Sequence, residues 1–229
     1  MRHHRRVKLA LQLGLSAIVC LVLALPAQAA LIGLKPTFPD LLANTSGSYS
    51  YDKESELFTI TAEPRTLTYS LSDYDYIYTS NNTKYSGQKS YAVNINIDNS
   101  GNFKHWLGGD LQIIGKVGDG TSYDGLLLTG EVTGFGYGDP ILLPTGQYQI
   151  FDFTFQITGG DLAVLFGGIG SSGGAIALSE SSTFDGDWNE NFDGQFTKAD
   201  NFPIPIPAAA WLFASGLIGL VVIRRGTKR

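Results

Sequence analysis

The segment 151–157, Phe-Asp-Phe-Thr-Phe-Gln-Ile, indicates the class of fold because its large apolar residues alternate strictly with polar ones. A period of two puts the apolar side chains on one face of a β-strand and the polar ones on the other. The segments 57–62 and 93–98 show the same alternation. Each of the three is therefore expected to be a strand with one buried face.

Further strand patterns run along the chain from residue 30 to residue 202, and turn sequences rich in glycine separate them. They lie at 48–51, 66–71, 74–78, 111–117, 126–135, 162–166 and 175–178. No long apolar stripe with a helical period and helix caps accompanies them. About ten short strands at this spacing predict an all-β body, a single jelly-roll-like β-sandwich over residues 30–202.

Charged residues are distributed unevenly over the 229 residues, whose formal net charge is −5. Half of the 16 basic residues lie before residue 9 or after residue 223, whereas all 21 acidic residues lie between Asp40 and Asp200. The body therefore holds 21 acidic and 8 basic residues, a net charge of −13. Such a body repels nucleic acid and anionic lipid, so nucleic acid is excluded as a partner.

Residues 1–29 have the parts of a secretory signal peptide. A basic start up to Lys8 precedes an apolar run over 9–25, and Ala27 and Ala29 are the small residues that signal peptidase requires. Cleavage leaves Ala30 first and removes the only cysteine, so the mature body forms no disulfide. The alternative is an uncleaved signal helix that stays as a membrane anchor.

Residues 203–229 form a second targeting segment, or address, at the other end of the chain. The uncharged apolar segment 208–223 spans about 24 Å as a helix, against about 30 Å for a hydrocarbon core, so a short transmembrane helix is expected. Prolines at alternate positions precede it, and Arg224 and Arg225 follow it. Because basic ends stay cytoplasmic, this helix anchors the body on the outer side of the inner membrane, where the signal also sends it.

This tail resembles the PEP-CTERM sorting signals of Gram-negative bacteria, in their VPLPA variant. The motif covers Pro205, Ile206, Pro207 and Ala208, and Ile206 stands where the parent family has Glu. The resemblance implies export, transient anchoring, recognition by an exosortase, removal of the tail, and delivery to the surface or extracellular matrix. It also implies an association with exopolysaccharide and biofilm. The alternative is a plain C-terminal anchor without processing.

Residues 170–174, Gly-Ser-Ser-Gly-Gly, match the Gly-x-Ser-x-Gly elbow of acyl hydrolases. Ser172 would be the nucleophile, and His105 is the single histidine of the mature chain. The elbow requires a strand-turn-helix setting, whereas this segment lies between two strand patterns. The protein is therefore expected not to be an enzyme, and a secreted hydrolase is kept as an alternative.

The acidic segment 185–193 carries oxygen-bearing side chains at alternate positions, among them Asp185, Asp187, Asn189 and Asp193. Calcium takes six to eight oxygen ligands, and Asp-x-Asp-x-Asn opens an EF-hand loop. Glu190 then stands where that loop needs glycine. A Ca²⁺ site at these four residues and a plain acidic loop are both compatible with the pattern.

Tyrosines gather between residues 69 and 91. They are Tyr69, Tyr74, Tyr76, Tyr78, Tyr85 and Tyr91. Exposed tyrosines suit sugar binding because the ring stacks on C–H groups while the hydroxyl forms hydrogen bonds. The ordinary preference of tyrosine for strands is the simpler explanation.

Taken together, these features predict an exported β-sandwich protein with a structural or adhesive role at the cell surface or in an exopolysaccharide matrix. The expected partners are signal peptidase, an exosortase, the inner membrane and exopolysaccharide. A carbohydrate- or calcium-binding module is the main alternative.

Overall fold

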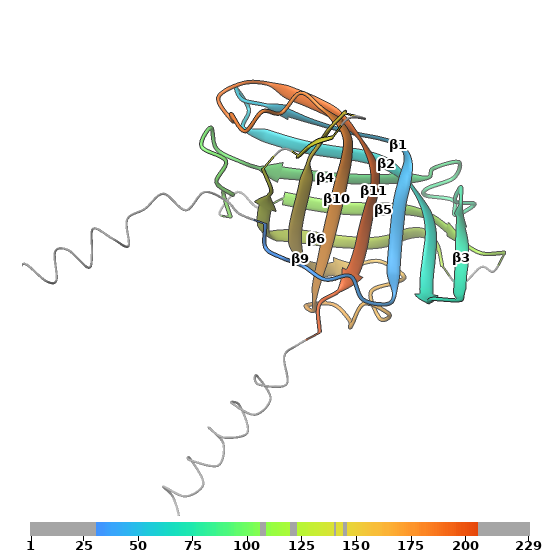
Figure 1. The fold of residues 1–229 in the computed structure, drawn as a ribbon. Coiled ribbons are helices and arrows are strands. Elements are labelled where there is room, and N and C mark those ends of the chain that lie inside the picture. Colours follow the sequence, from blue (N-terminus) through green and yellow to red (C-terminus); the bar gives the residue numbers. More distant parts are fainter. Residues whose placement is uncertain (1–30, 106–108, 120–122, 140, 144–145, 206–229) are drawn as a thin grey trace, which may run out of the picture.

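The computed structural model describes residues 31–205 except 106–108, 120–122, 140 and 144–145, and in this part the chain forms strands and no helix (Figure 1). The strands are β1 (Asp40–Asp52), β2 (Leu57–Ser70), β3 (Asp73–Tyr78), β4 (Ser90–Asn96), β5 (Gly109–Val117), β6 (Asp124–Tyr137), β7 (Ile141–Leu143), β8 (Gly146–Tyr148), β9 (Ile150–Gly159), β10 (Ser172–Ser182) and β11 (Phe192–Pro203). The predicted all-β class is confirmed for these residues. The predicted signal helix and transmembrane helix lie outside them.

The strands belong mainly to one antiparallel sheet that closes on itself. Along the ring, β1, β2, β4, β5, β6, β9, β10 and β11 each pair with the next, and β11 pairs with β1. Strand β2 is long enough to pair with two further strands, β4 and β3, and each of these also pairs with β5. Its first half, 57–62, pairs with β4, and its second half, 66–70, pairs with the short strand β3.

The order of the strands corrects the jelly-roll-like part of the sequence prediction. In a jelly roll, Greek-key connections pair strands that are distant in the chain. Here each strand of the ring pairs with the strand of the ring that follows it along the chain, so no Greek-key connection is present among them. In Figure 1, β9, β10, β11 and β1 pass in front of β4, β5 and β6, so two parts of the sheet face each other across the core.

Aromatic side chains fill the space inside the ring. Phe58 from β2 and Phe151 from β9 meet with ring centroids 4.8 Å apart, and both are buried. Phe135 and Phe192 pack around the same pair, at 5.4 Å and 6.2 Å from Phe58. Each such ring pair contributes roughly 0.5–1.5 kcal/mol beyond the area that it buries.

Two loops close the ends of this core. In the 183–191 loop, between β10 and β11, Phe184 and Trp188 turn inward, and Trp188 is only 2% exposed. The acidic segment is therefore a plug whose polar residues face outward around a buried tryptophan.

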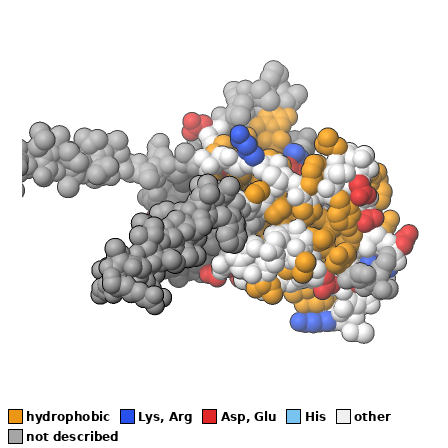
Figure 2. Space-filling view, turned by 90° about the horizontal axis from the view of Figure 1, so that it is seen from below, with side chains coloured by type: hydrophobic (Ala, Val, Ile, Leu, Met, Phe, Trp, Pro, Cys, Tyr) orange, Lys and Arg blue, Asp and Glu red, His pale blue; other side chains and the backbone are white. Residues whose placement is uncertain are grey.

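The 160–171 loop, between β9 and β10, closes the opposite end. The expected strand at 162–166 is wrong: Phe166 N–H bonds to the Leu162 carbonyl at 3.2 Å, which makes a single helical turn. Leu162 and Phe166 enter the core, while Val164 is 83% exposed. Figure 2 looks at the molecule from this end and shows apolar side chains on its surface. Within residues 31–205, gaps aside, no helix is long and apolar enough to cross a membrane.

The residues before β1, 31–39, form an extended N-terminal flank that runs across the outer face of the sheet (Figure 1). Its backbone is held by Asp152 of β9, whose two carboxylate oxygens accept the N–H groups of Ile32 and Gly33 at 3.0 and 2.9 Å. Further along, the Thr37 hydroxyl donates to the Pro203 carbonyl at 2.7 Å. The chain therefore enters and leaves the sheet at neighbouring places.

Gly194 of β11 is required by close packing, which generates a prediction. A Cβ there would overlap the Ser181 carbonyl and the Tyr49 hydroxyl. Overpacking of this kind costs about 1–3 kcal/mol, so Gly194→Ala should lower the free energy of unfolding by that amount in urea denaturation. Gly159→Ala is the control, because its Cβ would meet only the Thr129 hydroxyl, at 3.2 Å. Equal stability of the two variants would contradict the packing shown here.

Candidate binding surface

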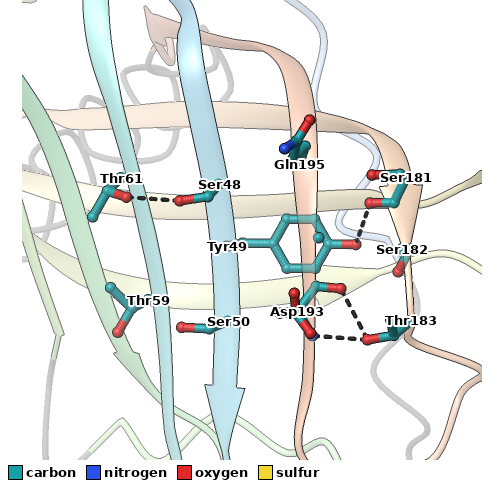
Figure 3. Close-up of a pocket in the computed structure, with 11 residues that line it drawn as sticks. Ser48, Tyr49, Ser50, Thr59, Thr61, Ser181, Ser182, Thr183, Asp193 and Gln195 are labelled. Atoms are coloured by element: carbon teal, nitrogen blue, oxygen red, sulfur yellow. Dashed lines mark hydrogen bonds between the residues drawn. The ribbon is translucent and has the colours of Figure 1, made fainter.

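A hollow of about 620 Å³ lies on the outer face of the sheet, over β2, β1, β11 and the end of β10 (Figure 3). We name it the hydroxyl concavity because most of its lining consists of hydroxyl side chains. The lining residues are Ser48, Tyr49, Ser50, Thr59, Thr61, Ser181, Ser182, Thr183, Asp193, Gly194 and Gln195. The volume lies within the range of about 300–1,000 Å³ that is usual for ligand pockets.

Strand register places these side chains in two parallel rows. In one row Ser48 lies between Thr61 and Gln195, and in the next Ser50 lies between Thr59 and Asp193. All point outward because they alternate with buried residues. Ser48 and Thr61 share a hydrogen bond of 3.0 Å between their hydroxyl oxygens, which fixes one row.

The edge of the concavity is fixed by contacts between the Thr183 side chain and the Asp193 backbone. Its hydroxyl accepts the Asp193 N–H and donates to the Asp193 carbonyl, both at 2.9 Å. The Asp193 backbone is thus held on both sides, and its carboxylate remains on the surface of the concavity. Asp193 is the one ionisable acid of the lining.

Tyr49 forms the floor of the concavity. Its ring is 3% exposed and packs on Phe151 inside the ring of strands, with centroids 5.1 Å apart. Its hydroxyl reaches between β11 and β10 to the Ser179 hydroxyl at 3.1 Å, through the space left by Gly194. Burial raises the pKa of Tyr49, so the phenol stays neutral.

This lining is suited to polyhydroxylated ligands. Hydroxyls donate and accept hydrogen bonds, an amide does both, and a carboxylate accepts from two neighbouring hydroxyl groups. The lining contains no histidine, cysteine or lysine.

The four residues of the expected calcium site are not gathered into one place. Asp185 and Asp187 accept backbone N–H groups two residues ahead, from Asp187 at 3.0 Å and from Asn189 at 2.8 Å, as in ordinary Asx turns. Asp193 lies apart from them, on β11. Among the described residues no three of His, Cys, Asp and Glu are grouped so as to hold a metal. Calcium binding stays a prediction.

Ser172 lies in the sheet. It is the first residue of β10, and its carbonyl accepts the Ile204 N–H at 2.9 Å. His105 lies in the connection between β4 and β5. The strand-turn-helix setting of a hydrolase elbow is therefore not found at Ser172.

The signal residues Ala27, Ala29 and Ala30 lie outside the described residues, as do Ile206, Pro207, Ala208, Arg224 and Arg225 of the sorting tail. Pro205 is the last described residue, and it is exposed. The predicted sorting motif would therefore begin at the surface of the body, directly after Ile204, whose N–H is bound to Ser172 of β10.

Five of the six tyrosines between 69 and 91 fall into two groups, and the sixth, Tyr85, lies half-buried in the connection between β3 and β4. Tyr91 is buried and donates to the Asn201 amide oxygen at 3.2 Å, and Tyr69 donates to the Asp75 carboxylate at 3.2 Å. Tyr74, Tyr76 and Tyr78 are exposed on β3. Strand propensity and core packing explain the first group, whereas the second has no such packing.

A half-buried carboxyl group that the sequence did not reveal lies where β1 begins. Burial and the nearby Asp200 carboxylate raise the pKa of Asp40 from 3.8 to about 7, although Lys198 acts in the opposite direction. Lys198 itself pairs with Asp200 at 2.6 Å. Asp40 therefore binds a proton near neutral pH, where an ordinary aspartate is ionised.

No protein-family model matches the chain, and neither a curated protein nor a solved structure does. Function is therefore inferred from the residues and their arrangement.

The raised pKa of Asp40 predicts a pH-dependent stability. The fold favours the protonated carboxyl, so this group lowers the stability progressively as the pH rises from about 4 to about 7. Asp40→Asn should raise the free energy of unfolding by about 1–3 kcal/mol at pH 8, a value discounted for partial exposure, and leave it unchanged near pH 4. Thermal melts at both pH values measure this, with the exposed Asp119→Asn as control. A gain of the same size at both pH values would contradict the assignment.

Proposed function

We propose that the chain is an exported protein, sorted by an exosortase-type enzyme, that acts as a structural or adhesive component of the cell surface or the extracellular matrix. The contact between Thr37 and Pro203 is the observation that carries this proposal, because the first part of the mature body and the start of the predicted sorting tail lie side by side. A body held at that one place keeps the rest of its surface free for other molecules.

The body itself suits such a role. Its ring of strands closes with residues 40–203 alone, so removal of residues 1–29 and of the chain after Pro203 leaves the sheet whole. The two facing parts of the sheet would serve as the layers of a sandwich-like unit. Two rows of polar side chains lie on part of its outer face, as expected of a protein that works among hydrated polymers.

The mass of the exported protein tests the proposal. A chain that begins at Ala30 and ends within the sorting tail is the expected product, because signal peptidase and an exosortase each remove one address. Pro207→Ala in the motif should increase the fraction that stays with the membrane, whereas Thr227→Ala should not. A mature mass that extends to Arg229 contradicts sorting by cleavage, and one that begins at Met1 contradicts signal cleavage.

A second candidate function, binding of carbohydrate, is supported by the lining of the hydroxyl concavity. Seven serine and threonine hydroxyls, one amide and one carboxylate line a single hollow. A neutral sugar supplies hydroxyl groups that match each of them. The negative charge of the body disfavours polymers of uronic acids.

Affinity electrophoresis of the exported protein in gels that contain a soluble neutral glucan tests this candidate. Asp193→Asn removes one acceptor charge and should weaken retardation about threefold to tenfold, since hydrogen bonds to charged groups are the stronger ones. Glu131→Gln is the matched control, because Glu131 is an exposed acid on β6 outside the concavity. Equal retardation of both variants would remove the concavity from consideration.

A further inference from the structure

Three tyrosines stand on one face of β3 and form an exposed stripe that we name the tyrosine row. Tyr74, Tyr76 and Tyr78 are 52%, 47% and 47% exposed. Leu71, in the turn just before β3, is almost fully exposed beside them. Large rings cluster in this way at the surface where a partner covers them, whereas single exposed rings are common.

The row is held rigidly by the strands around it. Tyr74 and Tyr76 lie opposite Thr68 and Thr66 of β2, and Tyr78 lies opposite Lys116 of β5. Between them on the strand, Ile77 points into the core and is 2% exposed. The three rings are thus displayed by a fixed backbone, which lowers the entropy lost when a ligand binds.

Neighbouring rings of the row are arranged at a steep angle. The centroids of Tyr74 and Tyr76 are 5.4 Å apart and their planes make 88°, an edge-to-face contact. The neighbouring Tyr76 hydroxyl raises the pKa of Tyr74. A ligand chain that is flat cannot stack on the faces of both tyrosine rings at once, whereas a chain whose successive units turn about its axis can.

We propose that the tyrosine row binds a neutral, twisted glycan chain along β3. The inference rests on the carbohydrate-binding candidate above but uses a separate surface. Rings supply stacking faces and hydroxyls supply hydrogen bonds, which is the combination that sugars require. The net charge of −13 on the body disfavours an anionic chain.

A second copy of the protein is a less suitable partner for this strand. β3 already pairs with β2 over Thr66–Ser70, and near its end with β5 through Ile77 and Tyr78. The Gly118 N–H also bonds to the Tyr76 carbonyl at 2.9 Å. The second half of the row is therefore paired on both sides, so another strand could be added only along the first residues of β3.

Affinity electrophoresis of the exported protein against a soluble β-1,3-glucan tests the proposal. Tyr74→Ala and Tyr76→Ala should each weaken binding about threefold to tenfold, and Tyr74→Phe, which keeps the ring, should weaken it less. Ile169→Ala, which shortens a side chain that is 74% exposed on the 160–171 loop, should change nothing. Microcrystalline cellulose, whose chains are flat, should not retain the protein. Unchanged melting temperatures show that the variants are folded.

Each contrary outcome is decisive. If the alanine variants bind the glucan as the wild type does, the tyrosine row is not the site. If only Asp193→Asn weakens binding, the glycan occupies the hydroxyl concavity, so the carbohydrate-binding candidate stands and this inference falls. Absence of binding in the wild type overturns both. If sedimentation shows a dimer that Tyr74→Ala dissociates, the row is an interface between copies and the proposal is wrong.

Discussion

Pairing between β1 and β11 is the interaction on which the rest of the structure depends. These two strands come from opposite ends of the body, and their hydrogen bonds close the sheet. Without this closure both strands would present unpaired N–H and C=O groups at an edge, where other chains can add. Closure also encloses the aromatic core, whose Phe58, Phe151 and Phe192 come from three different strands of the ring.

Much of the fold could be predicted because most strands have one buried and one solvated face. Strand β9 is an example, since its phenylalanines enter the core as their alternation indicates. β11 was missed because its sequence, with Asp193, Gly194 and Lys198, lacks that alternation. Asp200 and Asn201 are buried in it, where other strands and not solvent supply their surroundings. Closure of the ring therefore depends on the strand with the weakest local signal.

The candidate sites were predictable only where a single strand forms them. The tyrosine row is local, and the sequence indicated its residues, although not which of them are exposed. The hydroxyl concavity combines side chains from four strands that only register brings together. Likewise, alternation assigns Asp152 to the solvent, yet the N-terminal flank covers it and leaves it 2% exposed. Contacts between residues more than a hundred positions apart leave no mark in a local pattern.

The place where the chain leaves the sheet also determines how the molecule would respond to mechanical force. Tension on the C-terminal tail is transmitted to Pro203, at the end of β11, and this strand is hydrogen-bonded along both sides to β1 and β10. A pull along such a strand stretches many hydrogen bonds together, whereas a pull at a free edge breaks them one after another. A body tethered through this end would therefore resist drag, because the hydrogen bonds of β11 to β1 and β10 would be loaded in shear and would have to break together.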